Sequence, residues 1–125
     1  LPMEKIKNVI FLKSNFSDDE AQTKILSIFK NKIDVIISDM AENTTGNKSI
    51  DSIRTNTLCS EVINFSTKVL TSKGSVVSKL FMGEDFLEVK DLAKKNFKNV
   101  EFFKPKSSRS ESKETYIFCS TLKTL

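Results

Sequence analysis

The chain alternates short apolar runs with longer segments in which apolar residues recur at helical spacing. The short runs predict strands, because they are rich in β-branched and aromatic residues and end at turn-forming residues. Apolar residues spaced three and four apart predict helices that bury one face. The expected strands are 8–12, 33–38, 75–81, 100–103 and 115–120, and the expected helices run to about Lys30 from a cap at Ser17, from Ser52 to Leu70, and from Glu84 to Phe97.

Local signals support the ends of two of these helices. Ser17 and Glu20 have the spacing of a capping box, in which the two side chains bond to each other's backbone N–H groups. The segment 72–74, Ser-Lys-Gly, is typical of a helix stop. The second helix is expected to bury a stripe formed by Leu58, Val62, Phe65 and Val69.

The order of these elements predicts an α/β fold. Strand and helix alternate along most of the chain, which favours a mostly parallel sheet with helices on both faces. The strand 33–38, Ile-Asp-Val-Ile-Ile-Ser, is too apolar for a half-exposed strand, so both of its faces are expected to be covered. No helix separates the last two strands, so they are expected to pair antiparallel. The stretch 41–51 is expected to be a loop.

Three charged residues are expected at one edge of this sheet. Asp39 follows the strand 33–38, and Lys79 lies near the end of the strand 75–81. An antiparallel last strand would begin at the same edge, where Glu114 lies. Ligands of open α/β sheets bind outside the carboxyl ends of the strands. Taken singly, each residue has an ordinary explanation: Asp39 caps a turn, Lys79 extends its ammonium to solvent, and Glu114 protects a strand edge.

Composition narrows the class of protein. A chain of 125 residues is enough for one domain, and its net charge of +4 is compatible with a polyanionic partner. No histidine is present, which excludes a Ser-His-Asp triad and histidine-ligated metals within these residues. Cys59 and Cys119 form no metal-binding pattern and are expected to be reduced, buried thiols. No apolar run approaches the ~20 residues that span a bilayer, so no membrane association is expected.

A polar segment before the last strand carries four basic side chains. These are Lys104, Lys106, Arg109 and Lys113, with Glu111 among them. Contact with RNA phosphates and a solvated surface loop explain this pattern equally well.

Several of these segments together resemble the FtsJ/RrmJ family of RNA ribose methyltransferases. Residues 38–43, Ser-Asp-Met-Ala-Glu-Asn, resemble the family segment S-D-M-A-P-N, and residues 79–86 resemble K-x-F-x-G-x-x-F. Residues 104–116 are similar to K-P-x-S-S-R-x-x-S-x-E-x-Y, and Leu1-Pro2-Met3 matches the L-P-M that follows the second family strand. The resemblance covers essentially all of the chain, with the motifs in family order.

This resemblance implies a Rossmann-like class I methyltransferase that uses S-adenosyl-L-methionine. The expected reaction is methylation of a ribose 2'-hydroxyl of 23S ribosomal RNA, at a uridine in the A loop of the large subunit. The expected protein is a cytoplasmic monomer that binds the ribosomal subunit. Three members of the family's catalytic Lys-Asp-Lys-Glu tetrad fall on Asp39, Lys79 and Glu114, with Lys79 as general base and the carboxylates orienting it.

The resemblance also implies binding residues and shows departures. The expected cofactor-binding residues are Asn15, Phe16, Asp39 and Met40, and the expected RNA-binding residues are Asn43, Lys104, Lys106, Arg109 and Lys113. Glu42 replaces the family proline. The glycine-rich turn, the ribose-binding acid and the first tetrad lysine are not in this sequence, so residues 1–125 are interpreted as the C-terminal portion of one methyltransferase domain. That portion alone is expected to be inactive and aggregation-prone.

Three alternatives follow from the same features. A relative acting on transfer RNA or messenger RNA caps would share the fold and the tetrad. A non-catalytic RNA-binding protein would retain the fold without the upstream lysine and glycine-rich turn. A nicotinamide-dependent oxidoreductase would need G-x-G-x-x-G, which this sequence lacks.

Overall fold

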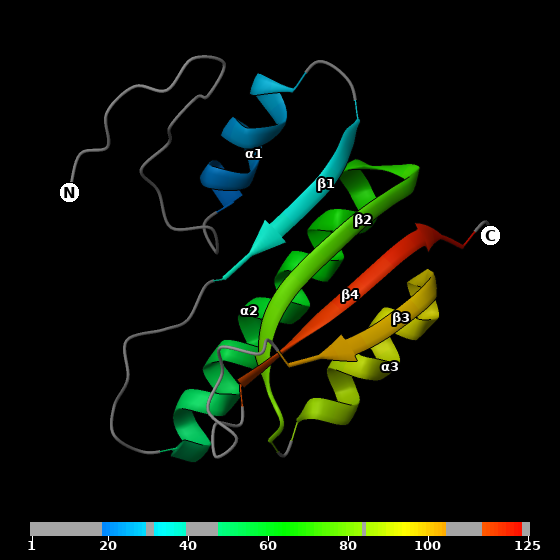
Figure 1. The fold of residues 1–125 in the computed structure, drawn as a ribbon. Coiled ribbons are helices and arrows are strands. Elements are labelled where there is room, and N and C mark those ends of the chain that lie inside the picture. The colour runs from blue at the N-terminus through cyan, green and yellow to red at the C-terminus, as the bar shows by residue number, and fades with distance from the viewer. Residues whose placement is uncertain (1–18, 30–31, 40–47, 84, 105–113, 124–125) are drawn as a thin grey trace.

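The computed structural model describes residues 19–29, 32–39, 48–83, 85–104 and 114–123. Within them, three helices alternate with four strands (Figure 1). The helices are α1 (Asp19–Ile28), α2 (Lys48–Val69) and α3 (Phe86–Asn96). The strands are β1 (Ile33–Ser38), β2 (Leu70–Phe81), β3 (Phe97–Phe103) and β4 (Glu114–Leu122). The predicted mixed α/β fold is confirmed.

The strands form one sheet in the order β1-β2-β4-β3. β1 and β2 are parallel, while β4 lies between β2 and β3 and pairs antiparallel with both. The predicted antiparallel pairing of the last two strands is therefore confirmed. Since β4 runs against its neighbours, its first residue lies at the edge where β1, β2 and β3 end (Figure 1).

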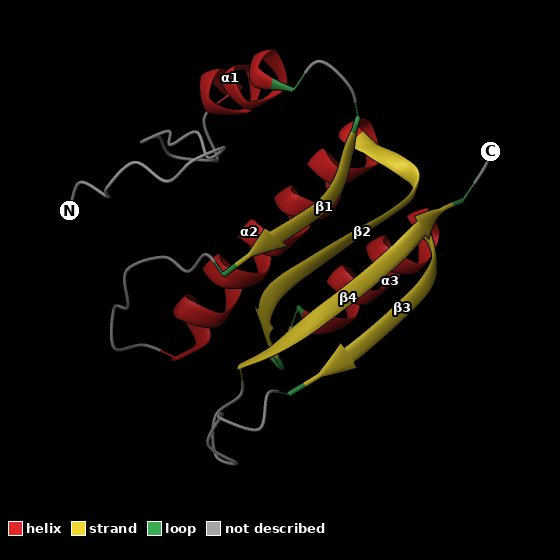
Figure 2. Cartoon of the chain, turned by 45° about the horizontal axis from the view of Figure 1, so that its top comes forward, coloured by secondary structure: helices red, strands yellow, loops and turns green. Residues whose placement is uncertain are grey.

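The hydrophobic core lies between the sheet and the helices α2 and α3, which cover the same face (Figure 2). Every member of the predicted α2 stripe is buried. Strands β2 and β4 contribute alternate residues to this core, and α3 contributes two side chains. The buried residues from these elements include Val76, Leu80, Ile117, Cys119, Val89 and Ala93. Among the described residues, the opposite face of the sheet carries side chains that do not enter this core.

β1 differs from the prediction that both of its faces are covered. Val35 and Ile37 are 56% and 76% exposed. The reason is geometric: α2 and α3 lie on one face of the sheet, and no helix of the described residues covers the other face at β1 (Figure 2). The sequence predicted helices on both faces of the sheet. In the described part of the chain, α2 and α3 cover one face.

The segment 72–74 also differs from its prediction, because it belongs to β2 and does not end a helix. α2 ends at Val69, and β2 begins at the next residue. Ile33 pairs with Leu70 but Val35 pairs with Ser75, so β2 bulges between these pairs. Gly74 permits the bulge, since a Cβ there would lie 3.0 Å from the Asp34 carbonyl oxygen.

The other element boundaries differ by a few residues. α2 begins at Lys48, inside the stretch predicted as a loop, and α1 ends at Ile28 instead of Lys30. Phe97 is the first residue of β3 and not the last of α3, although it is buried as its place in the apolar pattern requires. The predicted strand 8–12 and the cap at Ser17 lie outside the described residues.

Candidate active site

Four polar or aromatic side chains form a row across the sheet at the edge where β1, β2 and β3 end. Lys79 on β2 pairs with Tyr116 on β4, and Tyr116 pairs with Phe103 on β3. Asp39 follows directly after Ser38, which pairs with Ser78. Because neighbouring residues in register share a face of a sheet, the four residues form one line, which we call the cross-sheet row.

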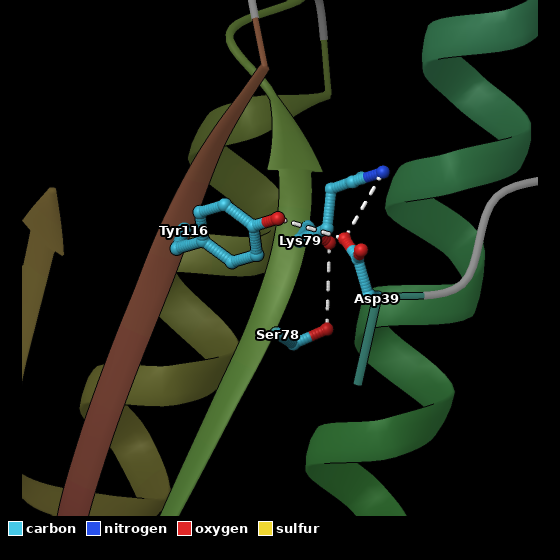
Figure 3. Close-up of polar contacts among 4 residues, drawn as sticks. All are labelled: Asp39, Ser78, Lys79 and Tyr116. Atoms are coloured by element: carbon cyan, nitrogen blue, oxygen red, sulfur yellow. Dashed lines mark hydrogen bonds and ion pairs between the residues drawn. The ribbon is translucent and has the colours of Figure 1, made fainter. Parts of the chain in front are cut away.

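Asp39 is the centre of a hydrogen-bonded group in this row (Figure 3). The Lys79 Nζ atom lies 3.0 Å from Asp39 Oδ1. The Tyr116 hydroxyl donates to the same oxygen at 2.8 Å. The Asp39 side chain is 64% exposed and that of Lys79 is 14% exposed. The pair is therefore reachable from solvent while the lysine stem packs against the sheet.

These contacts shift the pKa values of all three groups. Hydrogen bonds from Tyr116 and Lys79 lower the pKa of Asp39 below its ordinary value of 3.8. Burial lowers the pKa of Lys79, but the hydrogen bond to Asp39 and the charges of Glu114 and Asp39 raise it by more. The hydrogen bond to Asp39 raises the pKa of the Tyr116 phenol. At neutral pH the site consequently holds a carboxylate, an ammonium and a neutral phenol.

Glu114 lies on the same edge, as the first residue of β4. It is half-buried and pairs with Phe81, two residues beyond Lys79. Its negative charge acts on Lys79. The Lys104 ammonium donates to the backbone carbonyl of Glu114 at 3.3 Å, which places a second cation, this one exposed, near the row.

Asn56 of α2 fixes the end of β2 from the covered side of the sheet. Its side chain is fully buried. The side-chain amide accepts a hydrogen bond from the Phe81 N–H at 2.7 Å and donates one to the Phe81 carbonyl at 3.0 Å. It also donates to the Asp85 carboxylate at 2.8 Å, just before α3. One side chain thus joins α2, the end of β2 and the start of α3, two residues from Lys79.

The structure brings together the charged residues that the sequence placed on one edge. Lys79 contacts Asp39, and Glu114 acts on Lys79 electrostatically. Lys104 is also described and is exposed. The other candidates lie outside the described residues: Asn15, Phe16, Met40, Asn43, Lys106, Arg109 and Lys113.

Sequence reasoning missed two residues of this region, Tyr116 and Asn56. A signal for Tyr116 was present, because a residue two positions after Glu114 in a strand shares its face. No comparable signal marks Asn56, whose partners are backbone atoms 25 residues away and a carboxylate.

Two other kinds of feature are absent from the described residues. No helix there combines the length and apolar character that a bilayer crossing requires. No three Cys, Asp or Glu side chains of these segments gather in a way that would hold a metal ion.

A protein-family model described as "FtsJ-like methyltransferase" matches residues 1–122. The similar proteins include "Ribosomal RNA large subunit methyltransferase E" from Pelagibacter ubique, which is 53% identical over 121 residues. This match covers 97% of the present chain and 60% of the relative. A protein of the same name from Rickettsia akari is 42% identical over 117 residues, with coverage of 94% and 52%. The chain thus spans between half and two thirds of the length of these relatives.

A solved structure is similar as well. It comes from a Plasmodium falciparum protein assigned by name to the ribosomal RNA methyltransferases, and it superposes with a TM-score of 0.81 at 27% identity. The superposition covers 97% of this chain and 68% of that chain. The fold of the described residues is therefore that of a methyltransferase domain.

Proposed function

Since this chain belongs to the FtsJ-like methyltransferase family, we propose that it functions as a ribose 2'-O-methyltransferase. The proposed substrate is 23S ribosomal RNA, methylated at a uridine of the A loop. The observation that carries the proposal is the contact between Lys79 and Asp39 at the carboxyl edge of the sheet, with the charge of Glu114 beside it. The similar proteins named as ribosomal RNA methyltransferases support the choice of RNA class.

The methyl donor proposed for this site is S-adenosyl-L-methionine, which supplies an electrophilic methyl group. Of the residues expected to hold the donor, the structure describes Asp39. Its carboxylate is largely exposed at the sheet edge and already accepts two hydrogen bonds through Oδ1, so it is suited to accept further ones from a ligand. The exposed Asp39 carboxylate therefore fits a ligand that carries a polar, cationic group.

Lys79 is the proposed general base. A ribose hydroxyl becomes a good nucleophile as it loses its proton, and the Lys79 amine would accept that proton. The oxygen would form its bond to the methyl carbon as the bond from that carbon to the donor sulfur breaks, which leaves the demethylated thioether. Asp39 and Glu114 hold the amine in place and orient the hydroxyl. Their remaining contribution is positional, because methyl transfer requires the attacking oxygen to approach in line.

The raised pKa of Lys79 has a direct consequence for this role. Only the neutral amine can accept a proton, and Asp39 and Glu114 favour the ammonium. The methyl-transfer rate should therefore rise with pH across the neutral range, until another step becomes limiting. A cation supplied by the rest of the protein would move this rise to lower pH.

The test is methyl transfer from tritiated donor to undermethylated large ribosomal subunits, with the full-length natural protein. Lys79→Ala should lower the rate by about 10²- to 10⁴-fold, the usual contribution of a general base, while leaving donor affinity largely unchanged. Lys73→Ala is the matched control, because Lys73 is an exposed lysine of the same strand. Transfer at the wild-type rate by Lys79→Ala would remove Lys79 as the base.

The proposed RNA contacts are tested separately. Arg109→Ala should weaken RNA binding. The slope of log affinity against log salt concentration should become less steep by about 1, the value for loss of one phosphate contact. The measurement is fluorescence anisotropy of an A-loop RNA at several salt concentrations. An unchanged slope would favour the explanation of residues 104–113 as a solvated loop.

A further inference from the structure

Phe103 presents an aromatic ring to solvent at one end of the cross-sheet row. Its side chain is 45% exposed, whereas large aromatic side chains are usually well buried. It is the last residue of β3, the edge strand of the described sheet (Figure 1). Its ring stacks on that of Tyr116, with centroids 5.6 Å apart and planes 19° from parallel. The stack holds the ring in place and leaves nearly half of the side chain accessible.

The position of Phe103 relative to Lys79 follows from the strand register. Tyr116 pairs with Lys79 on one side and with Phe103 on the other, so Phe103 lies two strand spacings from Lys79. This separation is roughly 10 Å at the normal distance between neighbouring strands. A ribose hydroxyl at Lys79 would therefore leave Phe103 to meet a neighbouring nucleotide of the same RNA strand.

We propose that Phe103 is a stacking platform for a base that flanks the target nucleotide in single-stranded RNA. The inference rests on the proposed function, since it takes the target ribose to lie at Lys79. Exposed aromatic rings are the common partners of unstacked bases in single-stranded RNA. The Lys104 ammonium, held at the carbonyl of Glu114, adds a positive charge at the same edge of the sheet for the RNA phosphates.

The adenine ring of the methyl donor is another flat group that could stack on Phe103. The order of residues across the sheet argues against this alternative. Asp39, the described residue proposed to meet the donor, follows β1 at the opposite side of the row. Lys79 and Tyr116 lie between Asp39 and Phe103. The platform thus belongs to the RNA side of the site.

The experiment measures the binding of an A-loop stem–loop RNA and of S-adenosyl-L-methionine to the full-length natural protein. The variants are Phe103→Ala, Phe103→Leu and Phe103→Trp, and Leu87→Ala is the control because Leu87 is an exposed apolar side chain of α3. Phe103→Ala and Phe103→Leu should each raise the Kd for RNA by about 5-fold to 100-fold, the range for loss of one stacked base. Phe103→Trp should retain the wild-type affinity, and no variant should change donor affinity.

A second arm uses RNAs in which one flanking nucleotide at a time is abasic. One of these RNAs should bind the wild-type protein more weakly than the intact RNA does. The same RNA should bind Phe103→Ala with the Kd that it shows for the wild type. The inference is overturned if Phe103→Leu binds RNA like the wild type, if donor affinity falls instead, or if every abasic RNA loses equal affinity with both proteins. Failure of the proposed function looks different, because the wild-type protein would then bind RNA without transferring a methyl group.

Discussion

Replacing Asn56 by alanine should destabilise the protein through a single backbone group. The Phe81 N–H donates to Asn56 Oδ1, and alanine would leave it without that partner. The Phe81 carbonyl retains the N–H of Gly83 at 2.9 Å, and Asp85 is partly exposed, so both remain satisfied. An unpaired buried donor costs about 1–3 kcal/mol, and the lost volume of a fully buried side chain adds to this. The expected loss of unfolding free energy is about 3 kcal/mol.

The assay is urea unfolding of the full-length natural protein, with Asn56→Ala expected to lower the midpoint without changing the slope. Asn64→Ala is the matched control, since Asn64 is an exposed asparagine of the same helix. Its free energy of unfolding should stay within about 0.5 kcal/mol of the wild-type value. A loss below 1 kcal/mol for Asn56→Ala would show that water or a shifted strand replaces the lost acceptor, and the reasoning would be wrong.

Three other predictions concern the titratable groups. Tyr116→Phe removes the hydrogen bond that contributes most to lowering the pKa of Asp39, so this pKa should rise toward its ordinary value of 3.8. An NMR titration of the Asp39 carboxyl that shows no rise would contradict this. The lowered pKa of Asp39 contributes stability above pH 3.8 that is lost as pH falls through the folded-state pKa. The urea midpoint of Asp39→Asn should therefore fall less than that of the wild type when the pH is lowered below about 4. Burial raises the pKa values of Cys59 and Cys119 to about 11 and about 12, so iodoacetamide at pH 8 should label neither in the native protein and both in urea.

The sequence was sufficient for the order of the elements that the structure describes, and for the charged edge of the candidate site. Apolar periodicity identified the α2 stripe, because that face of the helix is buried from Leu58 to Val69. Asp39, Lys79 and Glu114 could be placed on one edge because an α/β sheet gathers the ends of its strands there. Topology alone was enough for this step, and no knowledge of side-chain contacts was required.

Other features depend on tertiary contacts that leave no local pattern. The segment 72–74 has the composition of a turn, yet it lies in β2 because Gly74 lets the strand bulge against the Asp34 carbonyl. Val35 and Ile37 belong to an apolar run but are exposed, since burial depends on what packs against a strand and not on its own residues. Asn56 is a polar residue whose role appears only when α2, β2 and α3 are packed together.

The central place of β4 in the sheet couples chemistry to folding. Its side chains reach the edge proposed as the active site only in one alignment with both neighbours, and Tyr116 meets Asp39 across 77 positions of sequence. A shift of one residue would turn Tyr116 toward the helices and bring Thr115 to the open face. Such a misaligned molecule would keep the circular dichroism of its helices. It would lose the methyl transfer that we propose for this edge of the sheet. Catalytic activity would then be a more stringent measure of correct strand alignment than any spectrum of secondary structure.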